Sequence, residues 1–382
     1  MEYNSEIYMD NSATTKPYEE VIEAMVEIMR NCYGNPSSSH SYGLKSEKKL
    51  NESREIIART LNCTKEEIVF TSGGSESNNF LIKGFAKGNV HIITSKIEHS
   101  SVLNTFKKLE NNGIRVTYLD TDHRGQINLE QLSNSINKDT VLVSIMHVNN
   151  EIGTIQDIYA IGKVIKEKSS RAKFHVDAIQ SYGKLPIDVK KGNIDLLSIS
   201  GHKIHGPKGV GAAYIKKGLN PMPLIEGGGQ ERKLRSGTEN VPAIVGLSVA
   251  AEIEHKNLQE NFNKVLALKK YFIKKLKNIE GVKINSEGDK FSPYILNVSF
   301  IGVKGEVLLH ALEEGNIYTS TGSACSSKLQ EKSHILQAIG LKEDEIYGSI
   351  RFSFSEFNNE KEVDYVIKVL KNLLTYLRRL KK

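Results

Sequence analysis

The stretch "TVLVSIMHV", residues 140–148, is apolar almost throughout, which is typical of a β-strand covered on both faces. Similar short runs flank it: "EIVFTSG" (67–73), "VHIITS" (90–95), "RVTYLD" (115–120), "KFHVDA" (173–178), "DLLSIS" (195–200) and "GAAYI" (211–215). Helical stretches separate most of these runs. Strands that alternate with helices predict an α/β fold with a mainly parallel central sheet.

The pattern changes after about residue 255, where a stretch rich in Lys and Leu leads to the strand-like segments "PYILNVSF" (293–300) and "SIRFSFS" (349–355). A chain of 382 residues is long enough for about two domains. We therefore predict a large domain over residues 14–255 and a smaller α/β domain over residues 256–382. Residues 1–13 are expected to pack on the smaller domain.

Composition and charge narrow the class of protein. Hydrophobic residues make up 39% of the chain and charged residues 25%, which is ordinary for a globular protein. The first residues show no basic or apolar leader, and no apolar run is long enough to cross a bilayer, so we expect a cytoplasmic location without membrane contact. The net charge of +7 is spread along the chain apart from the final "LRRLKK", and direct nucleic-acid binding is not expected.

Cysteines and histidines give little support for a metal. The cysteines Cys32, Cys63 and Cys325 are odd in number and far apart, which indicates neither a disulfide framework nor a zinc ribbon. His202 and His205 are close in sequence, but no acid or thiol cluster accompanies them. No metal site is therefore expected.

A lysine and an acid follow two neighbouring strands of the predicted sheet. Lys203 comes just after "DLLSIS", and Asp177 ends the preceding run. Ligands of open α/β sheets bind beyond the carboxyl ends of the strands, so both side chains fall at a candidate site. A pyridoxal phosphate site requires such a pair, because the amine forms a Schiff base with the aldehyde and the carboxylate keeps the pyridine nitrogen protonated. A buried lysine–aspartate ion pair is the alternative, and these two residues alone do not separate the interpretations.

A phosphate group needs backbone N–H donors, and "FTSGGSESNNF" (70–80) offers a strand, two glycines and the start of a helix. Gly73 and Gly74 allow a close approach of the chain, and Ser200 and His202 beside the lysine add further donors. This signal is weak alone, because "SGGS" is also an ordinary turn. It is not the G-x-G-x-x-G pattern of dinucleotide-binding folds.

Several longer motifs occur together, and jointly they resemble those of the cysteine desulfurases, fold-type I pyridoxal-phosphate enzymes of the aminotransferase class V superfamily. The motifs are "SIMHVNNEIG", "HVDAIQSYGKLPID", "SGHKIHGPKGVGA", "GGGQERKLRSGTEN" and "TSTGSACSS". The likeness runs from Tyr8 to about Phe357 and covers most of the chain. It implies a large domain with a mainly parallel sheet, a smaller α/β domain, pyridoxal 5′-phosphate as cofactor and L-cysteine as substrate.

The resemblance implies roles for residues around the cofactor. Lys203 matches the lysine that binds it, Asp177 the acid at the pyridine nitrogen, and Gln180 the amide at the ring hydroxyl. His99 matches a catalytic histidine stacked over the ring, although its residue type alone is more readily explained by a structural hydrogen bond. Contacts with the phosphate are implied for Gly74, Ser75, Ser200 and His202.

Other residues are implied in binding the substrate and the second subunit. Asn150 and Arg351 match the pair that holds the substrate carboxylate, and Asn150 is expected at the cofactor as well. Thr238 matches a residue that reaches the cofactor of the other subunit, which implies a homodimer. Without the motifs, an ion pair between domains would explain Arg351, and a turn would explain the two asparagines of "VNNE".

Cys325 matches the nucleophile, and its neighbours in "TSTGSACSS" are the small polar residues of a mobile loop. It would receive sulfur from L-cysteine as a persulfide, with release of L-alanine, and pass it to an acceptor protein for iron–sulfur cluster assembly or for thiolation of tRNA or cofactors. The alternatives are a selenocysteine lyase, another class V enzyme, or a non-catalytic protein with the same fold. The chain departs from the family at Ser75, where threonine is common, and at His205, where tyrosine is common. It also ends without the longer tail by which related enzymes dock a scaffold protein, and this leaves the acceptor open.

Overall fold

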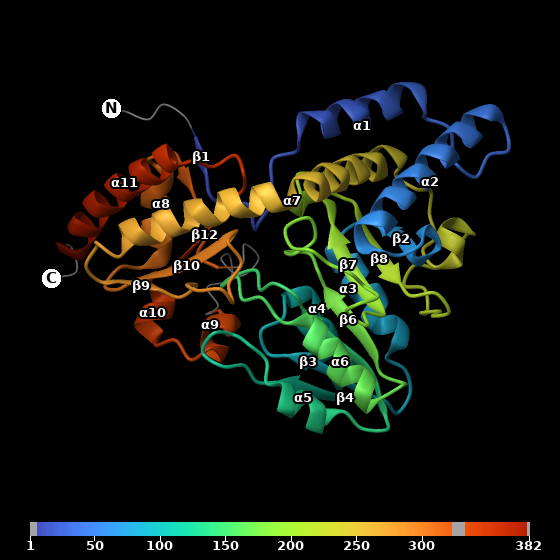
Figure 1. Cartoon of the computed structure of the whole chain (residues 1–382), viewed down its shortest axis with the longest axis horizontal. Coiled ribbons are helices and arrows are strands. Elements are labelled where there is room, and N and C mark those ends of the chain that lie inside the picture. The colour runs from blue at the N-terminus through green and yellow to red at the C-terminus, as the bar shows by residue number, and fades with distance from the viewer. Residues whose placement is uncertain (1–5, 323–332, 380–382) are drawn as a thin grey trace.

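A computed structural model describes residues 6–322 and 333–379 of the chain. It contains a seven-stranded sheet and a separate three-stranded sheet, which lie in two lobes bridged by one long helix (Figure 1). None of the helices in the described part of the chain is long and apolar enough to span a membrane.

The large sheet has the strand order β2-β8-β7-β6-β5-β3-β4. The strands from β7 to β4 are all parallel, and β8 runs antiparallel to both of its neighbours. The predicted α/β class with a mainly parallel sheet is thus confirmed. The strands are β2 (Ile68–Thr71), β3 (His91–Ser95), β4 (Arg115–Leu119), β5 (Thr140–Met146), β6 (Lys173–Asp177), β7 (Leu196–Ser200) and β8 (Gly211–Ile215).

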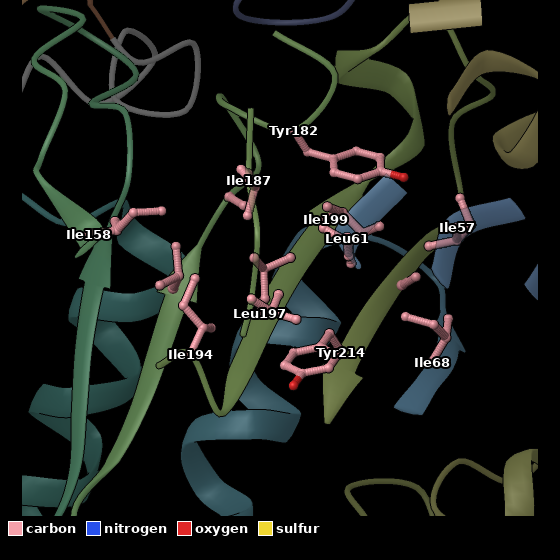
Figure 2. Close-up of a cluster of buried hydrophobic side chains, with 14 of the residues drawn as sticks. Ile57, Leu61, Ile68, Ile158, Tyr182, Ile187, Ile194, Leu197, Ile199 and Tyr214 are labelled. Carbon is pink, nitrogen blue, oxygen red and sulfur yellow. The ribbon is translucent and has the colours of Figure 1, made fainter. Parts of the chain in front are cut away.

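Helices cover both faces of this sheet, which explains why its central strands are buried and mostly apolar. Successive side chains of a strand point to opposite faces, so Leu142 packs in a core with residues of α3 and α4, and Val143 packs in a core with residues of α2, α6 and α7. Figure 2 draws part of the second core, including Leu197 and Ile199 of β7. The helices are α1 (Glu19–Asn31), α2 (Ser41–Leu61), α3 (Gly74–Phe85), α4 (Ser100–Asn111), α5 (Leu129–Ser135) and α6 (Ile158–Lys168).

The second lobe is built on an antiparallel sheet with the order β12-β10-β9. The short strand β1 (Ile7–Tyr8) pairs in parallel with β11 (Ile317–Tyr318), and Ile7 and Met9 enter the hydrophobic core of this lobe. The remaining elements are β9 (Val282–Ile284), β10 (Ile295–Phe300), α8 (Gly305–Glu313), α9 (His334–Ala338), α10 (Glu343–Tyr347), β12 (Ser349–Ser353) and α11 (Glu360–Arg379), with 3-10 turns η1 (Lys65–Glu67), η2 (Gly201–Lys203) and η3 (Gln230–Lys233).

One helix, α7 (Val241–Leu276), joins the two lobes and is 36 residues long. It begins where the Asn240 side chain accepts a hydrogen bond from the Ala243 N–H, a favourable N-cap. Its first half contributes Leu247 to the core of the large lobe, and its second half contributes Phe272 to the core of the small lobe. The domain boundary predicted between residues 255 and 256 therefore falls inside a continuous helix.

Candidate active site

The carboxyl ends of the central parallel strands open into a cavity that lies between the two lobes. Most of the predicted site residues line it: Gly74, Ser75, His99, Asn150, Asp177, Gln180, Ser200, His202, Lys203 and Arg351. Ser12, Ala13, Met146, Val148 and Ile179 complete the lining. Segments far apart in the sequence are brought together here because parallel strands end at the same edge of a sheet.

Lys203 stands in the 3-10 turn η2, directly after β7. Its Nζ atom donates hydrogen bonds to the backbone carbonyls of Ser12, at 2.5 Å, and Ala13, at 2.8 Å. The N-terminal segment thus holds the amine in the cavity. No residue of that segment had been given a role by the sequence, although "YMDNSATT" lies within the resemblance.

Asp177, the last residue of β6, is fully enclosed and lines the same cavity. Its carboxylate accepts hydrogen bonds from Asn78 Nδ2 at 2.8 Å and from the Ile179 N–H at 3.0 Å. Burial raises the pKa of this carboxyl, and the two hydrogen bonds and the charge of Lys203 act against that rise. Asn78 was missed by sequence reasoning, yet it lies one helical turn after Gly74 on α3, a spacing that places both on the same face.

The start of α3 meets the cavity at a point where the backbone leaves little room. Gly73, the N-cap residue, has a φ of 147°, which favours glycine. A Cβ atom on Gly74 would lie 2.2 Å from Ile179 Cδ1, so a larger residue would displace that side chain. The first N–H groups of the helix have no partner within it and form an anion site. Ser75, Ser200 and His202 line the cavity beside them.

Several buried polar atoms around the cavity have no hydrogen-bond partner in the described part of the chain. They are Ser12 Oγ, Asn150 Oδ1, Gln180 Oε1 and Arg351 Nε. An unpaired buried polar atom costs about 1–3 kcal/mol. Four such atoms around one cavity indicate a site built for a polar ligand. Together with the amine, the carboxylate and the anion site they fit a phosphorylated pyridine aldehyde.

His99 caps α4, and its Nδ1 atom accepts a hydrogen bond from the Ser101 N–H at 3.1 Å. In the neutral ring the proton therefore lies on Nε2. Burial, followed by the charges of Lys203, His334 and Arg351, lowers the pKa of His99 to about 4. The imidazole is neutral at pH 7 and can donate a hydrogen bond through Nε2. The sequence alone favoured a structural hydrogen bond for His99, and this helix cap is such a bond. His99 also lines the cavity.

Arg351 extends from β12 of the small lobe and is almost completely buried. Its Nη2 atom lies 2.7 Å from Asp10 Oδ1, and its Nη1 atom donates to the Asn150 carbonyl at 2.8 Å. Arg351 does form an ion pair, but its partner Asp10 pairs beside β12, so the pair lies within the small lobe and does not join the two domains as the alternative supposed. The hydrogen bond to the Asn150 carbonyl is a contact with the large lobe. Among the described residues, no group hydrogen-bonds the Nε atom of this guanidinium, which lines the cavity.

Thr238, another predicted site residue, does not line the cavity. Thr238 is exposed on the loop before α7. This loop is anchored by Glu231, whose carboxylate forms two 2.7 Å hydrogen bonds with Arg54. Cys325 lies outside the described residues. No acidic cluster lies near His205 in the sequence, but the fold brings Glu254 and Glu356 next to its side chain.

The free energy of unfolding is expected to fall as the pH drops from about 6.5 toward 4, because buried histidines must gain charge. Burial lowers the pKa of His175 to about 3 and that of His99 to about 4. In the unfolded chain the histidine pKa is about 6.5, so the unfolded state binds these protons at a higher pH than the folded state does. Each such histidine therefore lowers the free energy of unfolding by up to about 1.4 kcal/mol for each pH unit of acidification in that range. Denaturant unfolding at pH 7, 6 and 5 measures this slope.

The variant His175→Gln provides the control, since its side chain can still hydrogen-bond Ser144 and Ser198 but does not titrate. The slope should be shallower in this variant. An identical slope in both proteins would contradict the assignment of pH sensitivity to His175.

Comparisons with known proteins agree with this architecture. The aminotransferase class-V family matches residues 7–366. A "Cysteine desulfurase IscS" of Clostridium botulinum is 46% identical over 385 aligned residues, covering 99% of this chain and 96% of the relative. A solved "NifS-like protein" superposes with a TM-score of 0.93 at 40% identity, covering 98% of this chain and all of the other. A structure described as "SspA in complex with cysteine" superposes with a TM-score of 0.81 at 39% identity, covering 93% of this chain and all of the other.

These findings confirm the resemblance drawn from the motifs, and they extend it over nearly the whole chain. The family is pyridoxal-phosphate dependent, and its fold agrees with the parallel sheet and the second lobe described above. The chain belongs to the aminotransferase class-V family and, within it, to the cysteine desulfurases.

Proposed function

We propose that the cavity holds pyridoxal 5′-phosphate and that the enzyme desulfurates L-cysteine there, leaving L-alanine and a persulfide on Cys325. The observation that carries the proposal is the set of buried polar atoms, around the cavity of Lys203 and Asp177, that have no hydrogen-bond partner among the described residues. The relative structure with bound cysteine supports cysteine as the substrate. Bound pyridoxal phosphate would supply an electron sink for bond breaking at the substrate's α-carbon.

Different residues of the cavity would bind different parts of the cofactor. Lys203 would bind its aldehyde, and Asp177 would pair with the protonated ring nitrogen. Gln180 and Asn150 would offer amide oxygens that have no hydrogen-bond partner among the described residues. His99 would contact the ring as a neutral imidazole. The phosphate would be bound by Gly74, Ser75, Ser200 and His202 at the start of α3 and the end of β7.

The reacting groups of the protein then act on the substrate. Arg351 and Asn150 hold the carboxylate of L-cysteine, and the Lys203 amine takes the proton from its α-carbon. The thiolate of Cys325 attacks the substrate sulfur, so that a sulfur–sulfur bond forms as the carbon–sulfur bond breaks. A proton returned to carbon completes L-alanine, and the atoms balance without an external oxidant.

Arg351→Lys is expected to lower kcat/KM for L-cysteine by about 10–150-fold, the equivalent of about 1.5–3 kcal/mol for a hydrogen bond to a charged group. Lysine keeps the positive charge but loses the fork that matches a carboxylate. Steady-state kinetics should show the loss mainly in KM. If Asp10→Asn, which removes the ion-pair partner, gave the same loss, then Arg351 would be acting only through that pair.

The proposal includes a homodimer in which Thr238 reaches the cofactor of the other subunit. Its support is the exposed position of Thr238 on a loop fixed by the buried pair of Arg54 and Glu231. Sulfur would pass from Cys325 to an acceptor protein for iron–sulfur cluster assembly or thiolation, in the cytoplasm.

The test of this function is product analysis with L-cysteine and a reductant. Sulfide and alanine should appear in equal amounts, without any need for a keto acid. Activity that depends on a keto acid would instead indicate an aminotransferase. Selenide release from selenocysteine with little sulfide from cysteine would indicate a selenocysteine lyase.

A further inference from the structure

A second group of ionisable side chains lies buried at the junction of the two lobes. His205 follows the turn that carries Lys203, Glu254 belongs to α7, and Glu356 follows β12. His205 Nε2 lies 3.9 Å from Glu254 Oε1 and 3.6 Å from Glu356 Oε2, and one ligand atom from each residue falls within 4.8 Å of the others. None of the three lines the cavity described above.

The hydrogen bond on the far side of the imidazole fixes its tautomer. His205 Nδ1 lies 2.7 Å from the Lys16 carbonyl oxygen, which can only accept, so Nδ1 carries a proton. The neutral ring therefore turns the lone pair of Nε2 toward two carboxylates. Metal-binding histidines have this arrangement, with the second nitrogen donating to a backbone carbonyl.

The phenol of Tyr18 does not relieve the excess of acceptors. Its oxygen lies 3.0 Å from Glu254 Oε1 and 2.5 Å from Glu356 Oε1. One hydroxyl proton can serve only one of these carboxylates. The imidazole nitrogen and the two carboxylates thus face one another, and the phenol supplies a proton to only one of them, so a cation between them would be favourable.

We propose that His205, Glu254 and Glu356 bind one divalent cation of the zinc class, which ties the small lobe to α7 and to the segment that follows Lys203. One imidazole and two carboxylates are suitable ligands for such a cation, and sites with three protein ligands are common for zinc. The sequence near His205 contains no acidic cluster. The fold brings Glu254 from α7 and Glu356 from the segment before α11 to this histidine.

The surroundings of the cluster support a ligand. The Tyr294 hydroxyl is buried, has no hydrogen-bond partner in the described part of the chain, and lies within the electrostatic field of both glutamates.

Lys184 is the competing positive charge. It is buried, lies within the field of Glu254 and Glu356, and has its Nζ atom 5.4 Å from the centre of the Tyr294 ring. One ammonium offsets only one of the two carboxylates.

The decisive experiment is zinc binding to the natural, cofactor-loaded protein after removal of metals. Equilibrium dialysis against Zn²⁺ should give one ion per chain, and X-ray absorption at the zinc edge should show only nitrogen and oxygen ligands at about 2.0–2.2 Å. A sulfur shell at about 2.3 Å would place the ion on cysteine thiolates and overturn the proposal. Absence of stoichiometric zinc would mean that a proton occupies the position, and would overturn it as well.

Variants locate the ion. Loss of a residue that hydrogen-bonds a metal ligand typically weakens metal binding by roughly 10–100-fold. Glu356→Gln removes a ligand itself and should weaken Zn²⁺ binding by more than this. Glu360→Gln, an exposed position at the start of α11, is the matched control and should bind zinc like the natural protein. Cys325→Ala should also bind zinc normally. Equal affinity in Glu356→Gln and Glu360→Gln would reject this site even if zinc were bound.

Discussion

Lys203→Ala is expected to reduce sulfide release from L-cysteine by about 10²–10⁴-fold, because the substrate's α-proton would then have no positioned base. In the structure the Lys203 amine is held at the cavity by the carbonyls of Ser12 and Ala13. Alanine removes both the proposed base and the group that would bind the cofactor covalently. The variant should therefore also lose the yellow colour of the bound cofactor, which absorbance spectra measure directly.

An exposed lysine provides the control for this result. Lys217→Ala removes a lysine from the segment after β8 and should leave both colour and turnover unchanged. Far-ultraviolet circular dichroism of both variants checks that the fold is kept. Turnover by Lys203→Ala at the natural rate, with the fold intact, would show that another group is the base.

Cys325→Ala is expected to reduce sulfide release to the level of a protein-free control, while the cofactor colour stays. The carbon–sulfur bond needs a thiolate to accept the sulfur, and Cys325 is the cysteine that matches the family's nucleophile. Cys63 cannot replace it, because burial and the neighbouring charge of Glu67 raise the pKa of its thiol to about 12. A thiol with that pKa is almost never a thiolate at pH 7.

The matched variants are Cys32→Ala and Cys63→Ala, which remove half-buried cysteines elsewhere in the chain. Both should release sulfide and alanine like the natural protein. Full sulfide release by Cys325→Ala would contradict the persulfide mechanism and favour direct elimination of the sulfur. Mass spectrometry of the natural protein after a single turnover should find one added sulfur atom on the peptide that contains Cys325.

Much of the fold follows from local pattern. Each apolar run between residues 67 and 215 became a strand of the large sheet, because strands covered on both faces favour apolar side chains on both sides. The direction of β8 did not follow, since its composition resembles that of its parallel neighbours. Its antiparallel pairing reflects the short connection from β7, which is too short for a crossover helix.

The site was predictable where residue type and strand end coincide, as for Lys203 and Asp177. It was not predictable where the partner comes from a distant segment. Asp10 meets Arg351 only because the N-terminal segment pairs beside β12, and Glu356 meets His205 only because the two lobes close on each other. Such contacts depend on tertiary packing, and no local spacing in the chain records them.

Helix α7 has a consequence for how the protein can be divided. At 36 residues it is about 54 Å long, and each end is embedded in a different core. A helix propagates cooperatively, so disorder in one half removes hydrogen-bonded turns that the other half needs. Fragments cut at residue 255 would each carry half of the helix, with unpaired backbone groups at the new helix end and exposed apolar side chains. The two lobes are therefore poor units for recombination with other proteins, and we expect them to melt together.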